Sequence, residues 1–510
     1  MFTTVKSFAL DGISGFPVEV EVCAQKGLPS FDMVGLAAGA VKEAKERVRS
    51  AIKNSGFEFG SFHTVINLAP ADVKKDGSSL DLAIAIGYLT STGSVPYKNC
   101  GDYVFLGELG LDGALRKING VMPILISALQ LGYKKFIVPY GNAKEASFVD
   151  GAEVYAVSSL SEAVNILIGL NVNPIEKAVF AQYSDYVCEV DMADIKGQTM
   201  AKRALEIAVS GAHNMLMCGS PGTGKTMLAK CVTGIMPAMT FDEAIEVTKI
   251  HSVSGLINEE EGIVRHRPFR SPHHTASLPS ITGGGNNAKP GEVSLAHNGV
   301  LFLDEMPEYP RKTLEALRQP LEDGVITVSR VNRTAEYPAD FMLIASMNPC
   351  PCGYYGSSVK KCTCTPREIL NYVSKISGPL LDRIDIYVTV DNIEYGEFRS
   401  RRVPESSATV RERVERAREI QRKRFAEYGI RTNSQMNNSL IKRFCALDGD
   451  SENMLGKVFV KNNLSPRATT RILKTARTIA DLAGRENIAS DDLAEAIQYK
   501  TVDKKELTVF

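Results

Sequence analysis

One eight-residue segment constrains this chain more than any other. It reads Gly219-Ser220-Pro221-Gly222-Thr223-Gly224-Lys225-Thr226 and fits the pattern of a phosphate-binding P-loop in full. A short apolar run, Met215–Cys218, precedes it, and a helix-like run over 227–233 follows it. Glycines let backbone N–H groups curl around phosphates, and the N-terminus of the helix adds a partial positive charge. The segment therefore predicts a strand, a loop and a helix that bind a nucleotide.

Side chains of the loop and two later acids predict where ATP and Mg²⁺ bind. We expect Lys225 to bridge the terminal phosphates and the Thr226 hydroxyl to hold the magnesium ion. Residues 299–305 form an apolar strand that ends in two acids. Asp304 would hold the magnesium through its water shell, and Glu305 would polarise the attacking water as a general base. Acids often follow buried strands, so the pattern alone would be weak evidence. It is informative here because it accompanies a P-loop.

Three more polar residues are candidates for the same site. Asn348 follows the strand predicted over 341–346 and would orient water, although a loop-capping role is the alternative. Arg383 follows a helix-like stretch, and Arg467 begins a later helix. Either arginine could be an ordinary surface residue. In a ring of subunits, Arg383 would reach a neighbour's terminal phosphate and Arg467 its own.

Periodicity divides the chain into α/β parts and a helical end. Residues 1–170 predict a compact α/β domain, and 171–193 have no sustained period and predict a linker. Over 194–391 helices alternate with buried strands, which predicts a parallel sheet with helices on both faces. Residues 392–510 predict an all-helical lid. Expected strands are 18–22, 63–67, 103–107, 300–304 and 341–346; expected helices are 41–54, 80–89, 122–131, 405–428, 436–446, 464–484 and 491–499.

The charge balance offers no general attraction to nucleic acid or membrane. Lys+Arg and Asp+Glu both number 59, so any contact with a polyanion must be local. The apolar runs are shorter than the roughly 20 residues that span a bilayer, and residues 1–15 lack the pattern of a secretion signal. We therefore expect a cytoplasmic protein with no membrane partner and mostly reduced cysteines.

Taken together, the motifs resemble those of the magnesium-chelatase-like AAA+ ATPases, and within them the YifB/ComM group. The resemblance covers essentially the whole chain and includes the P-loop and segments 290–297, 347–353, 381–383, 465–467 and 476–484. It implies a homohexameric ring, with Arg383 as an arginine finger acting in trans and Arg467 as the sensor of the lid. It also implies a DNA helicase that drives branch migration during uptake and recombination of DNA.

The first domain resembles the ribosomal-S5-like fold of the Lon-protease type. Residues 75–79 are similar to the segment that bears the nucleophile of that protease. A serine nucleophile of this kind needs a lysine base, but the corresponding segment 119–125 has no lysine. We therefore expect that serine proteolysis is lost and that Ser79 caps a helix beside Asp81.

Four clustered cysteines form two C-x-C pairs, Cys350 with Cys352 and Cys362 with Cys364. Four thiolates are the ligand set of a closed structural zinc site, and the polar loop between the pairs is short enough to fold around a metal. However, C-x-C is tighter than the commoner C-x-x-C spacing, and cysteines are also ordinary buried residues. Zinc and a metal-free core both remain open.

Two predicted insertions hold candidate DNA contacts. The first lies between the P-loop and the acidic strand, and in the family it resembles an insertion that faces the ring pore; a polar surface loop is the alternative. The second is a hairpin predicted over 325–337. The candidates are Arg270, His273 and Lys289 in the first insertion and Arg330 and Arg333 in the second. His273 and the adjacent His274 make a poor metal pair, because neighbours in an extended chain point apart.

Residues 399–424 carry a net charge of +6, from ten Lys or Arg against four Glu. This predicts either a phosphate-binding face or a solvated helix with internal salt bridges, since Glu412 and Arg416 lie one helical turn apart.

Two other functions remain open at this stage. A chelatase-like motor would remodel a partner protein, although this chain contains no chelatase catalytic subunit. A nucleotide-dependent scaffold would act by binding alone, but such a protein would not need the water-activating carboxylate of Glu305.

Overall fold

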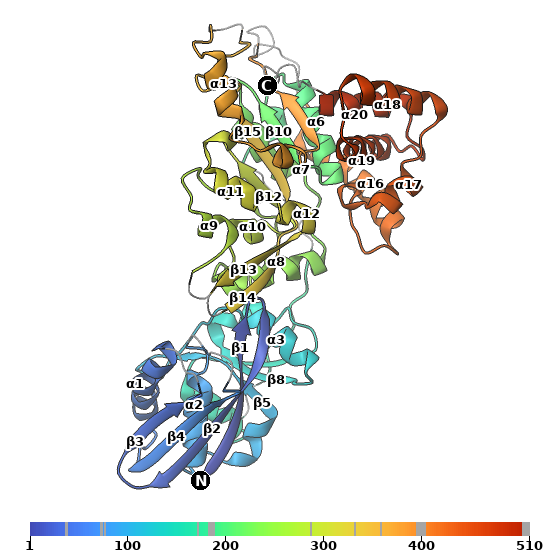
Figure 1. Ribbon diagram of the computed structural model, residues 1–510. Helices are drawn as coiled ribbons and strands as arrows, with labels where there is room; N and C mark the ends of the chain where they lie inside the picture. The colour runs from blue at the N-terminus through green and yellow to red at the C-terminus, as the bar shows by residue number, and fades with distance from the viewer. Residues whose placement is uncertain are drawn as a thin grey trace. The chain divides into compact units, whose positions relative to one another are not determined.

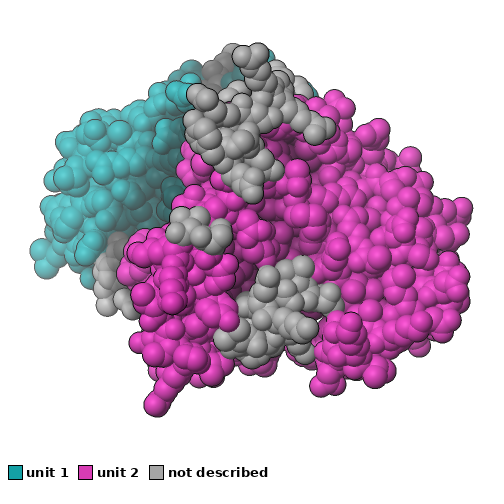
Figure 2. All heavy atoms as spheres, turned by 90° about the horizontal axis from the view of Figure 1, so that it is seen from above, with its two compact units in different colours: residues 1–182, 240–265 teal, residues 183–239, 266–510 magenta. Residues whose placement is uncertain are grey.

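The computed structural model describes residues 1–35, 39–71, 75, 78–170, 173–181, 189–285, 288–330, 333–357, 360–393 and 404–501. The chain forms two compact units (Figure 2). Unit 1 comprises residues 1–182 and 240–265, and unit 2 comprises residues 183–239 and 266–510. The segment 240–265 therefore packs with unit 1, although it lies inside the sequence range expected for the nucleotide-binding core.

Unit 1 is built on a mixed seven-stranded sheet with the order β3-β4-β2-β1-β5-β8-β9 (Figure 1). The strands β1 (Phe2–Asp11) and β2 (Ser14–Lys26) form an antiparallel hairpin, whereas β1 runs parallel to β5 and β3 parallel to β4. The other strands are β3 (Ser30–Val34), β4 (Phe62–Ala69), β5 (Tyr103–Phe105), β8 (Lys135–Pro139) and β9 (Glu153–Val157), with a separate short pair β6 (Glu108–Leu109) and β7 (Leu115–Arg116).

A fully buried helix forms the centre of unit 1. Every residue of α2 (Asp81–Ser91) is buried, as its continuous apolar sequence predicts. A Cβ atom on Gly87 would lie 2.6 Å from the Val22 side chain, so only glycine lets α2 approach the sheet this closely. The remaining helices are α1 (Gly39–Asn54), α3 (Val121–Gln130), α4 (Ala143–Ala146), α5 (Leu160–Leu167) and α8 (Phe241–Ser254).

The prediction that Ser79 caps α2 is wrong. The N-cap position belongs to Leu80, which has helical backbone angles and makes no side-chain cap. The Ser79 carbonyl instead accepts a hydrogen bond from the Gly107 N–H at 2.9 Å. The Asp81 carboxylate forms an ion pair with the Arg47 guanidinium, with a nitrogen-to-oxygen distance of 2.9 Å, and this compensates its charge inside the unit.

Unit 2 contains the parallel sheet that the sequence predicts. Its five strands have the order β11-β12-β15-β10-β16, and every pairing is parallel. The P-loop strand β10 lies between β15 and β16, so the loop emerges between two neighbouring strands at the carboxyl edge, where ligands of open α/β sheets bind. The strands are β10 (Met215–Cys218), β11 (Phe269–Arg270), β12 (Val300–Leu303), β15 (Met342–Met347) and β16 (Ile386–Thr389).

Shorter elements surround this sheet. The predicted hairpin is present as the antiparallel pair β13 (Val325–Arg330) and β14 (Arg333–Pro338). The helices are α6 (Thr199–Gly211), α7 (Lys225–Ile235), α9 (Leu278–Thr282), α10 (Glu292–Leu295), α11 (Arg311–Ala316), α12 (Pro320–Asp323), α13 (Pro366–Val373) and α14 (Gly378–Leu381).

The carboxyl-terminal part of unit 2 is helical, as predicted. Its orange and red helices gather on one side of the sheet in Figure 1. They are α16 (Ser407–Phe425), α17 (Asn438–Phe444), α18 (Gly449–Lys461), α19 (Pro466–Leu482) and α20 (Ser490–Thr501). Of these, α16 packs on α6 and α7, and α19 packs on α6. Helix α18 is not predicted from the sequence, because its Gly449, Asp450, Ser451 and Gly456 are weak helix formers.

The basic helix α16 is held by salt bridges to other parts of the chain and within itself. Arg413 contacts Glu206 of α6 and Glu405 before the helix, Arg424 contacts Asp481 of α19, and Arg422 contacts Glu419 of the same helix. The structure thus favours the salt-bridged interpretation of the positive segment over a free phosphate-binding face.

A search of the described residues finds no helix with both the length and the apolar character needed to cross a membrane.

Candidate nucleotide site

The P-loop has the backbone shape that phosphate binding requires. Gly222 and Gly224 have φ angles of 81° and 90°, in the left-handed region that favours glycine. A Cβ atom built on either would meet nothing within 4 Å. The loop therefore borders open space immediately before α7 begins at Lys225, and this space fits a phosphate chain against the helix N-terminus.

Lys225 is the centre of the polar contacts inside the loop. Its ammonium donates to the carbonyls of Gly219 at 2.6 Å and Ser220 at 2.9 Å, and to the side-chain oxygen of Asn348 at 3.2 Å. Burial lowers the pKa of Lys225, against the opposing charges of Asp304 and Glu305. Asn348, a candidate from sequence, thus meets the P-loop directly.

The two expected magnesium ligands are in contact. The Thr226 hydroxyl donates to the Asp304 carboxylate at 3.0 Å, across the gap between α7 and the end of β12. A hydroxyl and a carboxylate are oxygen ligands of the kind that Mg²⁺ prefers. The donor set therefore fits a magnesium ion held next to the loop.

Ser346 is a site residue that the sequence analysis missed. Its hydroxyl donates to the Asp304 carboxylate and accepts a 3.1 Å hydrogen bond from the Glu305 N–H. It therefore fixes both acids from the neighbouring strand β15. The only signal for it is a polar residue in an otherwise apolar strand.

Glu305 has an unusual backbone for a residue with a side chain. Its φ angle is 51°, and its side chain is exposed at the carboxyl edge of β12. Left-handed non-glycine residues concentrate at functional sites, where surrounding contacts hold them. The Ser346 hydroxyl and Asp304 provide such contacts here.

The two candidate arginines meet at one carboxylate. Arg383 is 8% exposed in its side chain and forms an ion pair with Glu322, and Arg467, 66% exposed, lies 3.9 Å from the other oxygen of the same residue. Burial lowers the pKa of Arg383, and the positive charges of Arg318 and Arg467 lower it further. No sequence pattern predicts that Glu322 would hold either arginine.

The first insertion presents its candidates in different ways. Arg270 is engaged in a two-point ion pair with Glu292, at 2.6 and 2.8 Å. His273 and Lys289 have exposed side chains, and the His273 ring contacts the Thr275 hydroxyl at 2.8 Å.

In the second insertion, the backbones of Arg330 and Arg333 pair at the end of the hairpin. Their side chains lie outside the described part of the structure.

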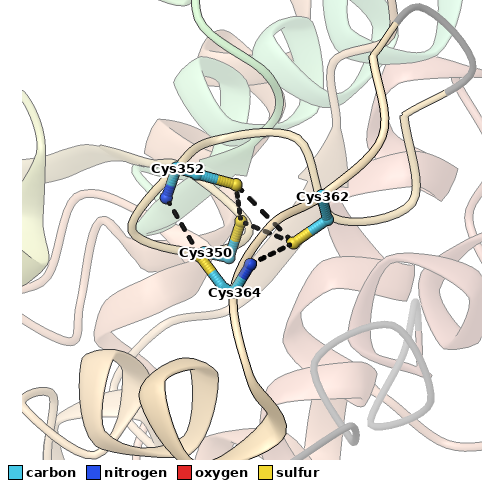
Figure 3. A group of neighbouring side chains, drawn as sticks. All are labelled: Cys350, Cys352, Cys362 and Cys364. Atoms are coloured by element: carbon cyan, nitrogen blue, oxygen red, sulfur yellow. Dashed lines mark hydrogen bonds between the residues drawn. The ribbon is translucent and has the colours of Figure 1, made fainter.

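The four clustered cysteines come together beside the P-loop. Figure 3 shows their side chains converging from two segments of one loop. The sulfur of Cys350 lies 3.3 Å from that of Cys352 and 3.7 Å from that of Cys362, and the Cys352 and Cys362 sulfurs are 3.6 Å apart. With Cys364 included, all four sulfurs lie within 4.8 Å of one another.

Three family models match successive parts of the chain. The model described as magnesium chelatase, subunit ChlI, matches residues 191–398. The model of subunit ChlI of Mg-chelatase matches residues 20–142, and that of the ChlI C-terminal part matches residues 404–500.

Curated relatives match almost the whole chain. Competence protein ComM of Haemophilus influenzae is 42% identical over 504 residues, which is 98% of this chain and 97% of ComM. The uncharacterized protein YifB of Escherichia coli is 42% identical over 496 residues, 97% of this chain and 96% of YifB. Lon protease 2 of Bacillus subtilis is 28% identical over 172 residues, 31% of this chain and 30% of the protease.

Proposed function

This chain belongs to the YifB/ComM family of magnesium-chelatase-like AAA+ ATPases, a nucleotide-hydrolysing family that uses ATP and Mg²⁺, and we propose that it is a ring motor acting on DNA. In this proposal ATP hydrolysis drives translocation, with branch migration during recombination or DNA uptake as the task. Similarity to a competence protein over 98% of the chain favours a task in DNA uptake. The proposed location is the cytoplasm.

The observation that carries the ATPase part is the contact of Thr226 with Asp304 at 3.0 Å. It brings the end of the P-loop to the acidic strand, although the two residues are 78 positions apart in the sequence. Magnesium bound here would neutralise charge on the phosphate oxygens during transfer. Thr226 and Asp304 would hold the ion, and Ser346 would keep Asp304 in place.

The chain's own groups supply the remaining steps. Lys225 exchanges its bonds to the Gly219 and Ser220 carbonyls for phosphate oxygens, because a charged acceptor binds an ammonium more strongly than a neutral carbonyl does. Glu305 takes the proton of the attacking water, and Asn348, already beside Lys225, orients that water toward the phosphate.

The proposed assembly is a homohexamer. In it Arg383 stabilises the charge on a neighbour's nucleotide, and Arg467 does so for the nucleotide of its own subunit. Both arginines contact Glu322 in the single chain. Completing the site therefore requires that Glu322 release them.

The proposed DNA contacts lie in the two insertions. His273 and Lys289 have exposed side chains, whereas Arg270 would first have to leave Glu292. Arg330 and Arg333 are proposed from their place at the end of the hairpin. We also propose that the four clustered cysteines hold zinc.

The second candidate is a motor that remodels a partner protein. The matches to magnesium chelatase subunit ChlI favour it, since they extend over most of the chain. A nucleotide-dependent scaffold is less well supported, because it would not need a general base. The Ser346 hydroxyl fixes the backbone of Glu305, the proposed base, at the end of β12.

The test is ATP turnover of the full-length protein with no DNA, single-stranded DNA, duplex DNA and four-way junctions. Stimulation by DNA, strongest with the junction, together with strand displacement, is the expected result. Turnover that no DNA changes would contradict the DNA part and favour a protein substrate. A strong reduction of turnover in Glu305→Gln assigns the hydrolysis to this site.

A further inference from the structure

The sulfur positions in the cysteine cluster match a single tetrahedral metal ion. Zinc binds thiolates at about 2.3 Å, which places the sulfurs of a tetrahedron about 3.8 Å apart. The sulfur separations among Cys350, Cys352 and Cys362 are 3.3 to 3.7 Å. Since all four sulfurs lie within 4.8 Å of one another, the space between them takes one ion.

Backbone donors point at these sulfurs. The Tyr355 N–H donates to Cys350 at 3.3 Å, the Cys352 N–H to Cys364 at 3.4 Å, and the Cys364 N–H to Cys362 at 3.4 Å. Backbone donors of this kind fix the positions of sulfur ligands around a metal ion.

The loop that carries the cysteines has almost no core of its own. Among its described residues, 350–357 and 360–364, only Cys350 and Gly353 are buried, and none lies in a helix or strand. Ordering such a segment costs conformational entropy that apolar burial does not offset. A metal bound by four side chains supplies the missing stabilisation.

The same loop contacts the P-loop. A Cβ atom on Gly353 would lie 2.6 Å from Pro221, so the two backbones are in close contact. Asn348, which accepts from Lys225, lies two residues before the first cysteine. A cavity of about 270 Å³ is lined by Gly219 and Ser220 on one side and by residues 355–357 of the loop on another.

From these contacts we infer that Cys350, Cys352, Cys362 and Cys364 bind one Zn²⁺ ion that holds the P-loop in its nucleotide-binding shape. The metal fixes the loop, the loop supports Pro221 through Gly353, and nucleotide affinity depends on the metal. This inference rests on the proposed function only in its ATP-binding part and is independent of DNA.

The first experiment counts the metal. Full-length protein reconstituted with zinc sulfate and freed of excess ion is analysed by inductively coupled plasma mass spectrometry. About one zinc per chain is expected, with loss of the metal in a Cys362→Ser, Cys364→Ser variant. The control Cys23→Ser changes a cysteine of β2 outside the cluster and should keep the zinc. A wild-type protein without zinc, whose four thiols form disulfides or stay free, would overturn the metal site.

The second experiment measures the Kd of a fluorescent ATP analogue in the presence of Mg²⁺. The double cysteine variant should bind at least about tenfold more weakly, with circular dichroism to check its fold.

A glycine pair separates the role of the loop from loss of fold. Gly353 and Gly429 have φ angles of 83° and 67°, so alanine introduces similar backbone strain at both. Only Gly353 faces Pro221, whereas Gly429 lies outside the cysteine loop and a Cβ on it meets nothing within 4 Å. Gly353→Ala should keep its zinc and bind nucleotide more weakly, and Gly429→Ala should match the wild type.

Unchanged nucleotide affinity in the zinc-free cysteine variant and in zinc-loaded Gly353→Ala would overturn the coupling. Failure of the proposed function gives other experimental outcomes than failure of the coupling. A protein that binds nucleotide and zinc but is indifferent to DNA leaves this inference intact. A protein that binds zinc but no nucleotide contradicts both the coupling and the ATPase.

Discussion

Asp385, one residue before β16, forms a buried ion pair with Arg471 of the lid helix α19. The Asp385 side chain is 2% exposed and also accepts a hydrogen bond from the Asn214 N–H at 2.9 Å. The pair connects the lid to the strand beside the P-loop strand. Burial alone would raise the pKa of Asp385, but Arg471 and His213 outweigh it and hold the pKa well below its usual range.

Asp385→Asn should therefore destabilise unit 2 by about 3 kcal/mol, because it leaves Arg471 without its buried partner. Urea unfolding followed by circular dichroism measures this, with exposed Asp323→Asn as the control. The sign of the pH dependence follows from the lowered pKa. The contribution of the ionised Asp385 to the free energy of unfolding is complete at pH values above its unfolded pKa of about 3.9. It is lost as the pH falls through the folded pKa. A variant as stable as wild type at pH 7 would contradict the role of the pair.

Glu305→Gln should reduce ATP turnover by about 100-fold or more, because it removes the general base. Nucleotide binding should persist, since Lys225 and the P-loop are unchanged. Phosphate release and analogue binding measure the two properties separately. Glu308→Gln is the matched control, as this nearby acid contacts Lys375 on the surface.

Arg383→Ala should lower turnover by about 1,000-fold if the arginine acts on a neighbour's nucleotide. Mixing this variant with Glu305→Gln should then restore part of the activity. In mixed rings, a subunit with intact Glu305 can receive Arg383 from the adjacent subunit. Glu322→Gln, which frees both arginines, should remain active. Absence of any recovery on mixing would place Arg383 outside the neighbour's site.

Ser252→Ala should destabilise unit 1 by about 1 to 3 kcal/mol, because Ser252 is a donor to the buried carboxylate of Glu145. Burial raises the pKa of Glu145, and hydrogen bonds from Ser252 and Met122 oppose that shift. Thermal unfolding at pH 7 measures the loss. Ser254→Ala is the control, since the Ser254 hydroxyl bonds only to the carbonyl of Ile250 within its own helix in the described structure.

The sequence by itself determined the local chemistry of this protein. The P-loop, the acidic strand after it and the predicted helices of the lid depend on spacing and periodicity within short segments, which a linear pattern records. The four cysteines were also visible as a group, because they lie within 15 positions of one another.

Only the tertiary structure decided which distant residues meet. Ser346 supports Asp304 because β15 lies beside β12, and Glu322 contacts Arg383 and Arg467 because three separate segments converge on it. The segment 240–265 packs in unit 1 through contacts such as that of Ser252 with Glu145. Such contacts depend on strand order and helix packing, and a sequence pattern has no period that encodes them.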